Sequence, residues 1–189
     1  MKKFEIALLV ALCITFCTGM WAQNRQDDLA DSLVRLHVIA NSDSEADQAA
    51  KLDTRDKVLA LLAPALKGVK TRDKAVDIIN SYLPQLKALT NGGTVTLSQE
   101  TYPTREYGDF SLPAGNYLSL RVILGAGEGH NWWCVVFPPL CTEALAESPE
   151  AACGLLDEDD EALITQKDDS YVLKFKIVEL WGEFKALVS

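Results

Sequence analysis

Apolar positions in the first part of the chain change from a two-residue spacing to a helical one. Apolar and polar side chains alternate over residues 34–40, a pattern that predicts a short strand. Ser42 and Glu45 have the spacing of a capping box and predict that a helix starts directly after the strand. Pro64 and Gly68 predict the end of this helix. Its expected apolar face comprises Ala49, Leu52, Leu59, Leu62 and Leu66.

A second helical pattern follows and ends at the sequence Asn91-Gly92-Gly93, whose residues tolerate a positive φ. Pro84 lies inside it and removes a backbone donor, which predicts a kink or a break. We expect the two helices to form an antiparallel pair. The apolar face of the second helix comprises Ala75, Ile79, Tyr82, Leu83, Leu86 and Leu89.

After residue 93 the spacing of apolar positions returns to two. Alternation over residues 94–98 and 117–124 and the apolar run 132–137 predict three strands. Gly125 to Asn131 is predicted to join the last two strands as a Gly-rich hairpin loop. The expected fold is therefore α+β, with an antiparallel sheet packed beside the helix pair.

The pattern is less regular toward the C-terminus. Residues 142–168 contain an acidic run and predict an irregular, solvated loop. Residues 173–187 keep helical spacing of apolar positions and predict a C-terminal helix. Alternation over residues 171–177 leaves a strand leading into a shorter helix as an alternative.

The N-terminus has the features of an export signal. Lys2 and Lys3 precede an apolar run, the order found in secretory signal peptides. A small-residue cleavage site is weakly marked, so residues 1–22 are predicted to be a signal peptide or an N-terminal membrane anchor. Residues 23–189 are then expected to form one exported domain, which touches the membrane only through the N-terminal segment if that segment stays uncleaved.

Composition narrows the classes of function. The chain has 189 residues and a net charge of −9, and 48% of its residues are hydrophobic. This length suits a single domain with a substantial core. The acidic charge disfavours contact with phosphate backbones, so nucleic-acid binding is not expected.

The segment GHNWWCVVFPPLC, residues 129–141, carries the candidate chemistry. A thiol hydrolase using Cys134 and His130 is the enzymatic reading, although four residues of strand would hold these side chains too far apart for a hydrogen bond. A zinc site would need Cys141 and Cys153 as well, at spacings unlike those of known zinc motifs. An oxidising compartment favours a disulfide between Cys134 and Cys141 across the Pro-Pro corner, and a reduced, buried pair is the alternative. We expect neither a metal nor a cofactor.

Two long segments resemble one family. RLHVIANSDSEADQAAKLDTRDKVL and YPTREYGDFSLPAGNYLSLRVILGAGEGHNWWCVVFPPLC are similar to the stage II sporulation protein R family. The resemblance implies a protein made in the forespore and secreted into the space between the forespore and mother-cell membranes. It further implies a ligand-like activator, not an enzyme, whose partner is a membrane-embedded aspartic protease, stage II sporulation protein GA, which cleaves pro-sigma-E.

A protein of this kind needs a contact surface. Aromatic and arginine side chains outside a core make good interface anchors. Trp132 and Trp133 point to opposite faces of a strand, so one is expected in the core. The other is either covered by a helix or available to a partner. The candidate contact residues are Tyr102, Arg105, Tyr107, Trp132 and Trp133.

Overall fold

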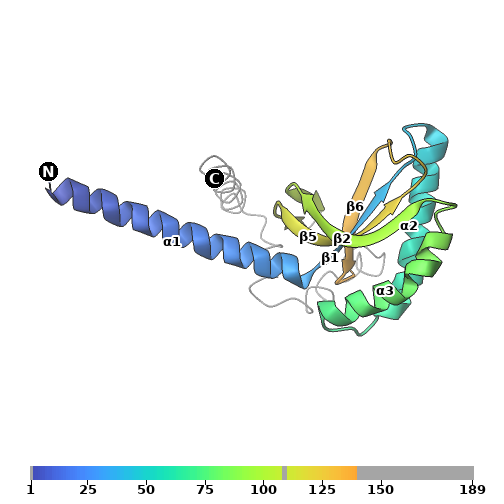
Figure 1. Ribbon diagram of the computed structural model, residues 1–189, viewed down its shortest axis with the longest axis horizontal. Coiled ribbons are helices and arrows are strands. Elements are labelled where there is room, and N and C mark those ends of the chain that lie inside the picture. The colour runs from blue at the N-terminus through green and yellow to red at the C-terminus, as the bar shows by residue number, and fades with distance from the viewer. Residues whose placement is uncertain (1, 108–109, 140–189) are drawn as a thin grey trace.

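The computed structural model describes residues 2–107 and 110–139, which form an α+β fold (Figure 1). Within these residues the helices are α1 (Lys2–Ser32), α2 (Glu45–Leu66) and α3 (Arg72–Ala88). The main sheet contains β1 (Val34–Ile39), β2 (Thr94–Tyr102), β5 (Gly115–Ile123) and β6 (Asn131–Phe137), and a separate β3–β4 hairpin contains β3 (Arg105–Tyr107) and β4 (Phe110–Leu112). The predicted fold class is confirmed. The predicted acidic loop and C-terminal helix lie outside the described residues.

The main sheet is mixed, with the strand order β2-β5-β1-β6. β1 runs parallel to β5 and antiparallel to β6, while β2 runs antiparallel to β5. The prediction of a wholly antiparallel sheet with a hairpin at Gly125–Asn131 is wrong, because β1 lies between the two strands that this loop connects. All six residues of β1 are buried, and a strand that is buried on both sides takes a central position.

α2 and α3 cover one side of the sheet, which we call the helix face (Figure 1). The prediction for α3 is confirmed, since Ala75, Ile79 and Leu86 are buried there. In α2 the last two residues of the predicted face, Leu62 and Leu66, are buried and Leu59 is half-buried. Ala49 and Leu52, at the start of that face, are exposed. The core on this face contains Val34, Leu36, Val38, Val58, Leu62, Leu66, Ala75, Ile79, Leu86, Leu120, Val122, Leu124, Val136 and Phe137.

The start of α2 differs from the predicted capping box. Ser44 is the N-cap, and its side chain accepts a hydrogen bond of 3.2 Å from the backbone N–H of Asp47. Ser42 instead donates to the Asp47 carboxylate at 2.5 Å. The chain offers two serines two residues apart, and the second one satisfies a free N–H of the first helical turn. Pro84 does not break α3, which runs through it to Ala88.

The other side of the sheet, called here the α1 face, is partly covered by the last turns of α1 and by the β3–β4 hairpin. Its cluster contains Leu29, Ala30, Leu33, Tyr102, Leu112, Tyr117 and Val135. The rest of α1 projects away from the sheet as a long rod (Figure 1). Its large apolar side chains from Phe4 to Trp21 are exposed, and by length and composition the helix is able to cross a membrane or serve as a signal sequence.

The Gly-rich loop after β5 crosses the end of β1 and packs against the residues that follow it. Gly129 N donates to Ala40 O at 3.0 Å, and Glu128 N donates to Asn41 O at 3.1 Å. A Cβ atom on Gly129 would lie 2.2 Å from Ser42 O. Close approach of two backbones, not a hairpin turn, therefore requires glycine here.

We expect Gly129→Ala to lower the free energy of unfolding by about 3 kcal/mol, because its methyl group forces backbone to move. Gly68 is the matched control: it has a φ of +77° and no atom within 4 Å of its Cβ position. Gly68→Ala should cost only about 1 kcal/mol of conformational strain. Urea denaturation measures both values, and an equal or smaller loss for Gly129→Ala would contradict the packing described above.

Candidate functional site

The two tryptophans of β6 lie on opposite faces of the sheet, as predicted. Trp132 packs against the helix-face core, and the Arg55 Cζ lies 5.1 Å from the centroid of its indole ring. Trp133 packs on the α1 face, where its ring centroid lies 5.4 Å from that of His37 and 4.0 Å from the Arg105 Cζ. Both indoles are half-buried, so neither fills the core completely.

Arg35 is the centre of an aromatic cluster on the α1 face. Its side chain is fully buried, and its Cζ lies 3.8 Å from the ring centroid of Tyr102 and 5.0 Å from that of Tyr117. Its Nη2 donates to the hydroxyl of Tyr107. Among the described residues, Nε and Nη1 have no hydrogen-bond partner and no carboxylate forms an ion pair with Arg35. Cation–π contacts of roughly 2 kcal/mol each therefore offset only part of the free-energy cost of removing this guanidinium from water.

Tyr102 connects this cluster to a charged group. Its hydroxyl lies 2.6 Å from Ser119 Oγ and donates to Glu100 Oε2 at 3.0 Å. Burial raises the pKa of Tyr102 far above its usual value, so the phenol stays neutral. Tyr102 is only 1% exposed. It therefore offers almost no exposed surface to a partner, whereas Tyr107 is half-buried in the β3–β4 hairpin.

Glu100 is half-buried and has four partners, namely His37, Tyr102, Ser119 and Arg121. His37 Nδ1 is 2.8 Å from Glu100 Oε1, and the Arg121 Nε lies 3.7 Å from the same oxygen. Burial alone would raise the pKa of Glu100, but attraction to His37 and hydrogen bonds from His37, Ser119 and Tyr102 outweigh it and lower that pKa. Glu100 therefore stays ionised and holds His37 in place.

Arg35, His37 and Glu100 were not among the site residues predicted from the sequence. The signal was present in β1, where a cation and an imidazole occupy alternate positions of an otherwise apolar strand. In a strand buried on both faces such residues must find partners, since an unpaired buried polar group is costly.

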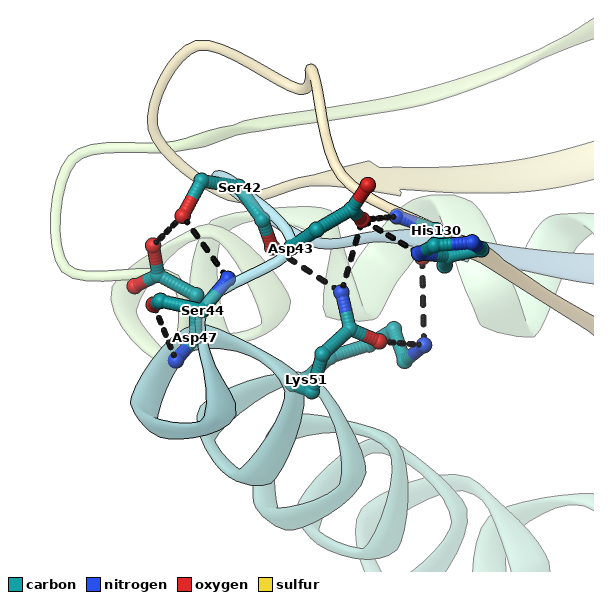
Figure 2. Close-up of polar contacts among 7 residues, drawn as sticks. Ser42, Asp43, Ser44, Asp47, Lys51 and His130 are labelled. Carbon is teal, nitrogen blue, oxygen red and sulfur yellow. Dashed lines mark hydrogen bonds and ion pairs between the residues drawn. The ribbon is translucent and has the colours of Figure 1, made fainter.

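A second polar cluster joins the β1–α2 loop to the residue before β6 (Figure 2). The Asp43 carboxylate accepts hydrogen bonds from the backbone N–H of His130, at 2.7 Å, and pairs with the Nδ1 of its ring. Lys51, which is buried, donates through Nζ to His130 O at 3.1 Å and to Gln48 Oε1 at 2.5 Å. These contacts hold the Gly-rich loop against the start of α2.

The structure does not favour a Cys134–His130 dyad. His130 precedes β6 and its side chain is directed to Asp43, while Cys134 is buried in the middle of the strand. Four residues of strand span about 13 Å, which is beyond hydrogen-bond reach. Within the described parts of the chain, no three His, Cys, Asp or Glu side chains are placed to hold a metal ion. Cys141 lies outside those parts, so the predicted disulfide stays a prediction.

Substitutions of Arg35 test whether its charge stabilises the fold. Arg35→Met keeps the length of the side chain without a buried charge and should change the free energy of unfolding by less than about 1 kcal/mol. Arg35→Lys loses the planar stack and the bond to Tyr107, and should lower it by about 3 kcal/mol. Urea denaturation of both variants measures these changes in the free energy of unfolding. A loss for Met as large as that for Lys would show that the guanidinium itself stabilises the fold.

The chain was compared with known proteins. Residues 30–147 match the family described as stage II sporulation protein R. The stage II sporulation protein R of Bacillus subtilis (strain 168) is 36% identical over 134 residues, which cover 66% of this chain and 60% of that protein. The match thus spans less than two thirds of the relative's length, and no solved structure matches. The matched region contains β1 to β6 with both polar clusters, and the chain belongs to the stage II sporulation protein R family.

Proposed function

We propose that this protein is an exported signalling protein of endospore formation that activates the membrane aspartic protease which processes pro-sigma-E. The family match over residues 30–147 is the observation that carries this proposal. The name of the Bacillus subtilis relative connects the family with sporulation. The forespore as source, the intermembrane space as destination and the protease as partner are what the family resemblance implies.

The N-terminal helix is compatible with this route. α1 has an exposed apolar segment of a length able to span a membrane, and a C-terminal end that packs on the sheet. If the segment is cleaved near residue 22, the helical turns around Leu29 and Ala30 stay with the domain and continue to cover Tyr102 and Tyr117. If it stays uncleaved, the same continuous helix tethers the sheet to the membrane.

The proposed mechanism is binding without catalysis. A ligand activates a protein only if it binds the active state more tightly than the inactive state. Arg105 and Trp133 stack on each other and remain half-buried, so together with Tyr107 they offer an aromatic and cationic contact on the α1 face. Trp132 offers a separate contact on the helix face.

The function is tested in a sporulating strain that lacks its own activator. Expression of the intact chain in the forespore should restore pro-sigma-E processing, read by immunoblot. A Leu9→Arg, Leu12→Arg double variant should fail, because two charges in the apolar segment block membrane insertion. Glu106→Gln, an exposed change in the domain, is the control and should be active. Absence of processing with the unchanged, exported chain would contradict the proposal.

The cysteines distinguish this proposal from a thiol hydrolase. We expect mass spectrometry of non-reduced peptides to show a Cys134–Cys141 disulfide, because an exported domain meets an oxidising compartment. Cys134→Ser should then lower the free energy of unfolding by about 2–4 kcal/mol and leave activation intact wherever the protein stays folded. A folded Cys134→Ser variant that cannot activate, together with a free thiol in the unchanged protein, would favour the hydrolase.

A further inference from the structure

β2 is an edge strand of the main sheet, and among the described residues one of its sides has no neighbouring strand (Figure 1). It pairs with β5 in an uninterrupted register over all nine of its residues, from Thr94 opposite Ile123 to Tyr102 opposite Gly115. An uninterrupted edge of nine residues is long enough to accept a further strand.

The register identifies which backbone groups of β2 face outward. Leu124 N donates to Ile39 O, so Leu124 directs its backbone groups toward β1. Backbone groups alternate along a strand, and therefore Ile123, Arg121 and Ser119 direct theirs toward β2. Their partners Thr94, Thr96, Ser98 and Glu100 are consequently bonded within the sheet. The residues whose N–H and C=O groups point outward are Val95, Leu97, Gln99 and Thr101.

Within the part of the chain that the structure describes, this edge has none of the features that normally protect one. Natural sheets block edge strands with proline, lysine, bulges or a covering element. The sequence TVTLSQETY contains neither proline nor lysine, and its pairing with β5 has no register shift. Its one charged residue, Glu100, is engaged with His37 and Tyr102. The outward backbone groups make no hydrogen bond with any described residue.

The side chains beside the edge define the chemistry of an added strand. Val95 and Leu97 are half-buried and pack against the helix-face core, so an added strand would extend that core with apolar side chains. Thr94, Thr96 and Ser98 are exposed on the α1 face, so its alternate side chains would be polar. With a net charge of −9, two copies of this chain repel each other, which favours a partner that is not acidic over self-pairing.

We propose that the free edge of β2 binds an extended segment of the partner protein, which has alternating apolar and polar residues and no net negative charge. The segment adds a fifth strand beside β2 through the backbone groups of Val95, Leu97, Gln99 and Thr101. This inference rests on the proposed function, because it takes the activated protein as the partner.

Gln99 allows a test with a matched control, since it is exposed and its N–H points outward. Gln99→Pro removes this donor and obstructs the edge without removing a bond to β5. Gln99→Ala removes the same side chain and keeps the N–H. In the complementation assay with graded expression, Gln99→Pro should need at least about tenfold more protein than Gln99→Ala for half-maximal processing, because it loses a backbone hydrogen bond and strand alignment.

The results of this assay distinguish a failure of the edge proposal from a failure of the proposed function. Equal activity of the Gln99→Pro and Gln99→Ala variants, with the unchanged chain active, would overturn the edge proposal and leave the proposed function standing. An inactive unchanged chain would overturn both. If light scattering shows a dimer that Gln99→Pro converts to a monomer, the occupant is a second copy and not the partner.

Thr101 provides a second test position if the Gln99→Pro variant folds poorly. If Gln99→Pro melts at a much lower temperature than Gln99→Ala, Thr101→Pro is compared with Thr101→Ala in the same assay. Thr101 is exposed, and its N–H also points outward. Unfolding of both proline variants would show that these N–H groups are bonded within the fold, which would also overturn the proposal.

Discussion

The pairing of β1 between β5 and β6 is the interaction on which the rest of the structure depends. Every residue of β1 is buried, so each face of this strand must be covered by a different element. α2 and α3 cover the side of Leu36 and Val38, while the end of α1 and the β3–β4 hairpin cover the side of Arg35. The same pairing brings the Gly-rich loop over the end of β1, where only glycine permits the approach of the two backbones.

The sequence predicted the fold class, the four strands of the main sheet and the apolar face of α3, because these depend on local periodicity. It did not predict β3 and β4. The parallel pairing of β1 with β5 was not predicted, because these strands are far apart in the sequence and local periodicity contains no information about long-range pairing. The Gly-rich segment was interpreted as a hairpin for the same reason: glycines that relieve close packing resemble glycines that turn a chain. The cap of α2 was misplaced by two residues because Ser42 and Ser44 both precede possible partners.

The candidate site was predictable only in part. Of the predicted contact residues, all but Trp132 gather on the α1 face. They surround Arg35 and His37, which occupy the polar positions of β1 and were not predicted as site residues. A buried cation without a paired carboxylate, such as Arg35, stabilises a fold poorly. Among the described residues, the sheet has one face filled by α2 and α3, one face partly covered, and the edge of β2 without a neighbouring strand.

The claim that this chain acts through the open edge of β2 is most directly tested by residue-resolved amide hydrogen exchange, with and without membranes that carry the partner protease. In the protein alone, the amides of Leu97 and Gln99 should exchange fast, while those of Thr96 and Ser98 are protected by their bonds to β5. With the partner bound, the amides of Leu97 and Gln99 should become protected as well. Slow exchange of Leu97 and Gln99 in the protein alone, or exchange that the partner leaves unchanged, would contradict the account.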